Sequence, residues 1–146
     1  MVVVRMSQGV YELLYSTVGQ VPPEAGAVIG GRGLLISCAW FDEGAGQPVY
    51  RPSAAAIEEV VRGWEEQGES FLGIVHSHAD AFPHLSPMDL RSAGMIMDAN
   101  GMDSMLLGLF CRGQLSLFRA WATEPGCRGR LEEVELRIVP DDADCI

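Results

Sequence analysis

The stretch from Phe71 to Asp89, FLGIVHSHADAFPHLSPMD, constrains the fold more than any other part of the chain. It begins with an apolar run that predicts a buried strand, and the run stops at His76 and His78. Alternate side chains of a strand leave the same face about 6.6 Å apart, so the two imidazoles are expected to converge. Ser86, followed by a proline, then predicts the start of a helix, with Asp89 in the first turn and directed back toward the strand end.

Two neutral imidazoles and one carboxylate form a ligand set that suits a divalent metal ion. They supply three tetrahedral positions and leave the fourth for water, as a catalytic zinc site requires. Each half of the pattern also has a purely structural interpretation. Ser-Pro-x-Asp alone most often caps a helix, and a His-x-His pair alone can simply end a strand. The joint spacing of His-x-His, seven residues, Ser, two residues and Asp favours the metal site.

This joint pattern at His76, His78, Ser86 and Asp89 resembles the signature of the JAMM (MPN+) zinc metalloprotease family, and it matches at all four positions. The family also uses a glutamate well upstream, and Glu24 stands in a segment with a similar register. The residues that carry this second similarity are Pro22, Glu24, Ala27, Val28, Ile29 and Gly31.

The chain departs from the family pattern at two positions, neither of which is a ligand. Ala79 stands where the family usually has proline, and Ala27 stands where glycine is commoner. The resemblance extends from about Tyr11 to Trp121, which is most of the chain.

The resemblance implies that His76, His78 and Asp89 hold a Zn²⁺ ion. It implies that Glu24 takes a proton from water and passes it to the leaving amine, and that Ser86 donates a hydrogen bond to the oxyanion. The reaction implied is hydrolysis of an amide or isopeptide bond without a covalent intermediate. The substrates implied are the C-terminal tails of ubiquitin-like or sulfur-carrier proteins, and the short chain resembles a minimal prokaryotic JAB-type member.

Other residues near the motif have less specific interpretations. Glu43 is the next candidate for the general base if Glu24 does not serve. His84 lies inside the motif loop, where a histidine is more often solvated than in contact with metal or substrate. Asp80 could hold one imidazole in its tautomer.

Two other functions share parts of this pattern. Some proteins with this fold lack the ligands and act as non-catalytic MPN scaffolds in larger assemblies, an alternative that the intact ligands disfavour. A zinc deaminase shares the metal and the fold but needs a Pro-Cys-x-x-Cys string, which this sequence does not contain.

Composition limits the remaining classes. With 146 residues and 48% hydrophobic content, residues 1–146 are expected to form a single domain. A net charge of −10 argues against nucleic-acid binding.

No apolar run approaches the roughly 18 residues of a membrane span, and the N-terminal run is too short for a signal peptide, so a cytoplasmic protein is expected. The four cysteines have no paired spacing and are expected to be reduced thiols.

Apolar periodicity predicts strands that alternate with helices, an α/β sandwich. The resemblance implies more closely a mixed, curved sheet flanked by helices, the cytidine deaminase-like JAB1/MPN fold. Strands are predicted at 1–6, 27–29, 34–41, 48–50, 71–75, 104–111, 115–122 and 131–138, and helices at 10–18, 52–67 and 86–99. Hairpins are predicted at 30–33 and 112–114, and residues 141–146 are expected to fray.

Overall fold

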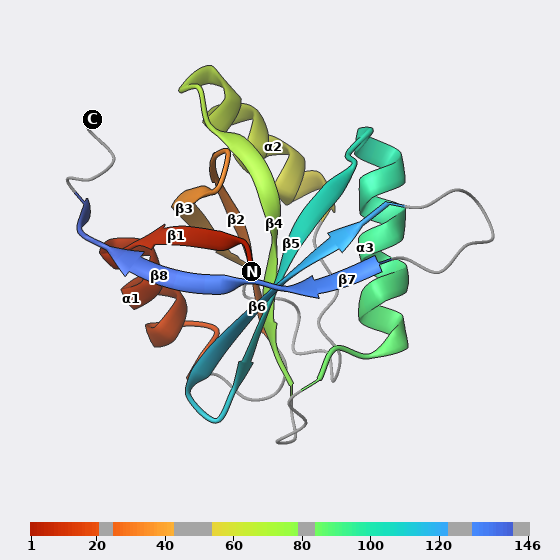
Figure 1. Ribbon diagram of the computed structural model, residues 1–146. Coiled ribbons are helices and arrows are strands. Elements are labelled where there is room, and N and C mark those ends of the chain that lie inside the picture. Colours follow the sequence, from red (N-terminus) through yellow and green to blue (C-terminus); the bar gives the residue numbers. More distant parts are fainter. Residues whose placement is uncertain (21–24, 43–53, 79–83, 123–129, 142–146) are drawn as a thin grey trace.

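The computed structural model describes residues 1–20, 25–42, 54–78, 84–122 and 130–141 (Figure 1). The strands are β1 (Val3–Ser7), β2 (Gly26–Arg32), β3 (Leu35–Asp42), β4 (Ser70–Ser77), β5 (Ser104–Cys111), β6 (Gln114–Trp121), β7 (Arg130–Glu133) and β8 (Glu135–Val139), and the helices are α1 (Gln8–Ser16), α2 (Ala54–Glu66) and α3 (Pro87–Asn100). This arrangement confirms the predicted mixed sheet flanked by helices. The strand predicted at 48–50 and most of the tail lie outside the described residues.

The strands form one mixed sheet in the order β7-β6-β5-β4-β2-β3-β1-β8. The segment that contains β7 and β8 brings the two edges of this sheet together. The amide of Val134 donates to the carbonyl of Leu117 on β6, and the next amide, that of Glu135, donates to Val2 beside β1. Because successive amides of an extended chain point to opposite sides, this segment lies between β6 and β1. The curved sheet is therefore nearly closed into a barrel, as Figure 1 shows.

Helix α1 covers one face of the sheet, and α2 and α3 cover the other (Figure 1). The α1 face is a closed core in which Leu14, Ile29 and Val75 have no exposed surface. The opposite core is smaller and forms where Ala93 and Met97 of α3 pack on the sheet. Helix α2 has no fully buried residue, so this second face is less completely filled.

A β-bulge in β4 determines which residues face α2 and α3. The register between β2 and β4 shifts between Ile29 and Gly30, whose partners are Gly73 and Phe71, so Leu72 is the extra residue. As a result Phe71 and Ile74 pack in the α3 core, whereas Leu72 packs in the α1 core. The bulge precedes the histidines and leaves their alternation intact.

The hairpin between β2 and β3 lies later in the chain than the sequence predicts. The turn is at Gly33, where φ is 59°, and at Leu34, while Gly30 and Gly31 belong to β2. A Cβ atom at Gly30 would lie 2.5 Å from the ring of Trp64. Glycine at this position therefore lets α2 pack closely on the sheet. No helix in the described ranges is long and apolar enough to cross a membrane.

Candidate metal centre

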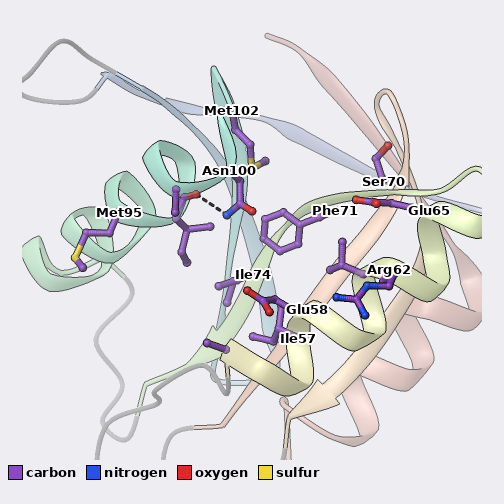
Figure 2. Close-up of a pocket in the computed structure, with 14 residues that line it drawn as sticks. Ile57, Glu58, Arg62, Glu65, Ser70, Phe71, Ile74, Met95, Asn100 and Met102 are labelled. Atoms are coloured by element: carbon purple, nitrogen blue, oxygen red, sulfur yellow. Dashed lines mark hydrogen bonds between the residues drawn. The ribbon is translucent and has the colours of Figure 1, made fainter.

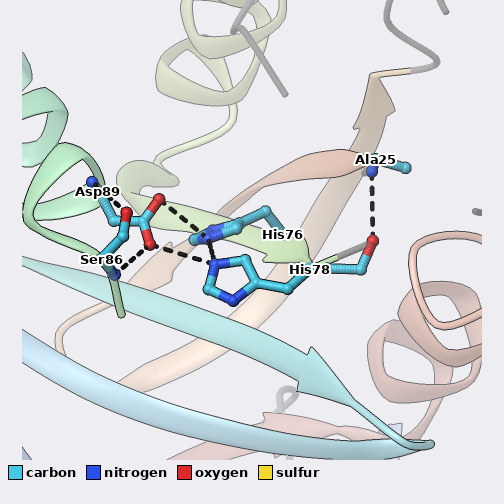
Figure 3. A network of polar contacts seen from close by, with 6 residues as sticks. Ala25, His76, His78, Ser86 and Asp89 are labelled. Atoms are coloured by element: carbon cyan, nitrogen blue, oxygen red, sulfur yellow. Dashed lines mark hydrogen bonds and ion pairs between the residues drawn. The ribbon is translucent and has the colours of Figure 1, made fainter. Parts of the chain in front are cut away.

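The end of β4 and the start of α3 place the predicted ligands side by side (Figure 3). His76 is the penultimate residue of β4 and is 6% exposed, and His78 directly follows the strand. Ser86 is the N-cap of α3 and forms a capping box with Asp89. The amide of Ser86 donates to Asp89 Oδ2 at 2.7 Å, and the amide of Asp89 donates to Ser86 Oγ at 3.1 Å. The cap therefore holds the carboxylate facing the histidines.

The ligand atoms of these three residues converge on one point. The Nε2 atoms of His76 and His78 lie 3.2 Å apart. Each Nε2 also lies 3.2 Å from a carboxylate oxygen of Asp89, Oδ1 for His76 and Oδ2 for His78. A tetrahedral ion about 2.0–2.1 Å from each ligand holds its ligand atoms about 3.3–3.4 Å apart. The two histidines approach different oxygens of the carboxylate, and one ligand atom from each of the three residues lies within 4.8 Å of the others, a separation that a single metal ion can bridge.

The electrostatics of this group also fit a cation. Burial raises the pKa of Asp89, but hydrogen bonds from His76 and Ser86 lower it by more, so that the pKa lies well below its usual range. The carboxylate is therefore ionised at neutral pH. Neutral imidazole nitrogens that face each other beside a carboxylate repel one another unless a proton or a metal ion lies among them. The group His76, His78 and Asp89 is accordingly capable of binding a metal ion.

Of the other predicted site residues, the structure describes Ser86 and His84. Ser86 lies next to the group, and its hydroxyl accepts the capping hydrogen bond while its own hydrogen can still donate. His84 is exposed on the segment before α3 and is not part of the metal-ligand group. Glu24, Glu43 and Asp80 lie outside the described residues, so their predicted roles stay predictions.

The structure also contains a cavity that was not predicted from the sequence. It has a volume of about 620 Å³ and lies between α2 and α3 over β4 (Figure 2). Ile57, Val61, Phe71 and Ile74 contribute apolar surface to it. The spacing of apolar residues along α2 predicts one buried face. The same spacing does not distinguish a helix that packs tightly from one that borders a cavity.

Comparisons with known proteins identify the fold. No family model and no curated protein sequence matches the chain. A protein of Desulfitobacterium hafniense solved in solution superposes with a TM-score of 0.67 at 18% identity, covering 94% of each chain. A JAB1/MPN domain protein from Archaeoglobus fulgidus superposes with a TM-score of 0.51 at 14% identity over 91% of this chain and 95% of that one.

A third structure bears the name "JAMM: A Metalloprotease-like Zinc Site in the Proteasome and Signalosome". It superposes with a TM-score of 0.50 at 14% identity, covering 92% of this chain and 97% of that chain. The fold of the present chain is therefore that of the JAB1/MPN domain proteins. On this fold it carries a His-His-Asp group that can hold a metal ion.

Proposed function

We propose that the protein is a zinc-dependent metallopeptidase of the JAMM type. The observation that carries this proposal is the convergence of two imidazole nitrogens and a carboxylate at mutual distances of 3.2 Å on a JAB1/MPN fold. Zinc is the proposed ion because two histidines and one carboxylate are a common catalytic zinc ligand set, which leaves a fourth position open. When bound, such an ion acts as a Lewis acid and lowers the pKa of water to about 7.

The side chains have separate roles in the proposed reaction. His76, His78 and Asp89 hold the ion, and the capping box orients Asp89. Glu24 takes a proton from the attacking water and delivers it to the leaving amine. The Ser86 hydroxyl donates a hydrogen bond to the oxyanion that develops on the scissile carbonyl. The amide bond is cleaved directly by water, without an acyl-enzyme.

The proposed substrate is the C-terminal tail of a ubiquitin-like or sulfur-carrier protein, joined through an amide or isopeptide bond to a second group. The family resemblance of the motif supports this choice. The cavity between α2 and α3 also supports a protein substrate, because it offers apolar surface on the sheet face that carries His76. We further propose that the chain forms a single domain and acts in the cytoplasm.

Metal content tests whether the group binds zinc. Protein purified with zinc supplied should contain about one zinc ion per chain by mass spectrometry of the metal. His76→Ala should lose this zinc ion to a competing chelator, because the two remaining ligands do not hold the ion tightly enough. His84→Ala is the matched control, since this histidine is exposed and outside the group. A folded wild-type protein that binds no zinc would favour a non-catalytic scaffold.

Cleavage tests the reaction. The purified protein is offered a panel of fusions in which ubiquitin-like proteins from its own genome precede a reporter. The wild type should cleave at least one of them. Glu24→Gln should keep its zinc and lose about 10²–10⁴-fold in rate, as expected for a lost general base. Ser86→Ala should lose about 10²–10³-fold in kcat. If Glu24→Gln cleaves as fast as the wild type, the base is misassigned and Glu43 is tested next.

A further inference from the structure

Asp42, the last residue of β3, is a buried carboxylic acid to which the proposed reaction assigns no role. It is 4% exposed, and among the described residues only Ser7 and His76 are also both polar and buried. An ionisable side chain is rarely buried unless polar groups surround it, because its desolvation is costly. The position of Asp42 in the sheet shows which polar group it can serve.

The register of the sheet places Asp42 and His76 in one row. Gly26 of β2 pairs with Asp42 of β3 on one side and with His76 of β4 on the other. Residues directly opposite each other in antiparallel strands project from the same face of the sheet. Asp42 therefore leaves the sheet on the face that carries His76, and the residue between them has no side chain.

The adjacent row of the sheet supports this direction. It consists of Phe41, Ala27 and Val75, which pair in the same way and belong to the α1 core. Because successive side chains alternate, Asp42 and His76 project from the opposite face, which α2 and α3 cover. Two strand spacings of about 4.8 Å place the Cα atoms of Asp42 and His76 about 10 Å apart.

One ring nitrogen of His76 requires a partner outside the metal-ligand group. The contacts that His76 forms with described residues use Nε2, which faces Nε2 of His78 and Oδ1 of Asp89 (Figure 3). A histidine that binds a metal ion through Nε2 carries its proton on Nδ1, and this N–H almost always donates to a carboxylate, a backbone carbonyl or water. The sequence suggests Asp80 for such a role, but Asp80 lies outside the described residues, whereas Asp42 is placed on the required face.

We infer that Asp42 is a positioning residue that holds the imidazole of His76 through one water molecule. The inference rests on the proposed function, which makes His76 a zinc ligand. A water that accepts from Nδ1 and donates to the carboxylate spans up to about 5.6 Å with two hydrogen bonds of about 2.8 Å. The two side chains cover the rest of the separation between β3 and β4. This contact fixes the tautomer and the orientation of the ring and makes Nε2 a stronger ligand.

Zinc affinity is the first test, measured by competition with a chromophoric chelator. Asp42→Ala removes the acceptor and should bind zinc about 10–100-fold more weakly than the wild type. Asp42→Asn keeps the shape and a neutral acceptor, which is weaker than a carboxylate, so its affinity should lie between the two. Asp98→Asn is the control and should stay within about 2-fold of the wild type, since it removes the same charge from an exposed residue outside the metal-ligand group. Equal affinities of the wild type and Asp42→Ala would overturn the inference.

The second test observes the Nδ1 proton of His76 by NMR of the zinc-loaded, ¹⁵N-labelled protein, with the ring signals assigned through their correlations to the His76 backbone. In Asp42→Ala this proton should exchange with solvent at least about 10-fold faster, and Asp42→Asn should again lie between. Weaker zinc binding in Asp42→Ala with unchanged exchange would show an effect of charge or folding alone and would refute the role of Asp42. If Asp42→Ala does not fold, Asp42→Asn decides, because wild-type affinity and exchange in that variant contradict the inference.

The outcomes separate this inference from the function on which it rests. A wild type that binds no zinc refutes the proposed function and the role of Asp42 together. A wild type that binds zinc with the affinity of Asp42→Ala refutes only the role of Asp42. A lower Tm in Asp42→Ala with unchanged zinc affinity and proton exchange would likewise reduce Asp42 to a structural residue.

Discussion

Two groups of polar side chains on the same sheet balance their charges in different ways. On β6 and β7 the arginine–tryptophan group consists of Arg119, Trp121, Arg130 and Glu132. Arg119 forms an ion pair with Glu132, and Trp121 Nε1 donates to the same carboxylate at 3.3 Å. The guanidinium groups of Arg119 and Arg130 lie 4.6 Å and 4.8 Å from the centre of the tryptophan ring. The positive groups here meet a carboxylate or an aromatic face of the protein itself.

The metal-ligand group at the end of β4 consists instead of side-chain atoms that can bind a cation. His76, His78 and Asp89 bring two imidazole nitrogens and a carboxylate together, and no arginine belongs to this group. Both carboxyl groups have a lowered pKa, but the causes differ. For Glu132 the main cause is the hydrogen bond from Arg119, whereas for Asp89 hydrogen bonds from His76 and Ser86 outweigh the opposing effect of burial. The comparison teaches that the positive groups of the arginine–tryptophan group find their partners within the protein, while the metal-ligand group gathers atoms that can hold a metal ion.

Replacement of Asp89 should have the largest effect and should affect both metal and helix. Asp89→Ala should abolish stoichiometric zinc binding and remove the capping partner of Ser86, which costs about 1 kcal/mol of the free energy of unfolding. Asp89→Asn keeps an oxygen that can accept from the Ser86 amide, so it should retain the cap while zinc binding still falls. Competition with a chromophoric chelator measures the affinity for zinc. Urea unfolding of the zinc-free proteins measures how much the helix cap contributes to the free energy of unfolding. Zinc binding by Asp89→Asn with wild-type affinity would contradict the assignment.

Replacement of Arg119 should give the reverse result, a stability change without a metal change. Its side chain is 18% exposed and contacts both Glu132 and Trp121. Arg119→Ala should lower the free energy of unfolding by about 0.5–1 kcal/mol through the lost ring contact, and the lost ion pair acts in the same direction. Zinc content should equal that of the wild type. A loss of zinc in this variant would show that the two groups are coupled across the sheet.

Acid should remove the contribution that the Glu132 carboxylate makes to the free energy of unfolding. The pKa of Glu132 is lowered from 4.5, chiefly by the hydrogen bond from Arg119. A group with a lowered folded-state pKa contributes stability above its unfolded pKa and loses that contribution as pH falls through the folded value. The difference in stability between the wild type and Glu132→Gln should therefore shrink below about pH 4.5. Urea unfolding at pH 6, 4 and 3 measures it, and a difference that grows in acid would contradict the sign.

The convergence of His76, His78 and Asp89 could be predicted because each step is local. Strand alternation places the two histidines on one face, and the cap at Ser86 aims the first turn of α3 at them. The family resemblance of the joint spacing indicated that these two local elements meet. The capping interaction and the predicted oxyanion contact use different capacities of the Ser86 hydroxyl, since it accepts one hydrogen bond and can donate another.

The remaining features depend on contacts between distant residues and could not be predicted in the same way. The bulge at Leu72 arises from the pairing of β4 with β2, and closure of the sheet depends on Val134 meeting Leu117 of β6. Gly30 lies in β2 and not in the β2–β3 turn, and its lack of a side chain leaves room for Trp64 of α2, a contact 34 positions away in the sequence. The hydrogen bond from Ala25 to Ser77 joins residues 52 positions apart, so no local pattern indicates it.

Replacement of Arg130 should have the smallest effect and separates stacking from ion pairing in the arginine–tryptophan group. Arg130 is exposed and lies over Trp121 on the strand opposite, where it is the register partner of that tryptophan. Arg130→Ala should lower the free energy of unfolding by about 0.5 kcal/mol, the value typical of an exposed cation–π contact. Arg130→Gln is the matched control, because it keeps much of the side-chain length without the charge. Urea unfolding at low and high salt distinguishes the contributions. If the contact is electrostatic, salt should reduce the gap between the wild type and both variants, whereas an equal gap at all salt concentrations would assign the effect to packing of the side-chain stem on the ring.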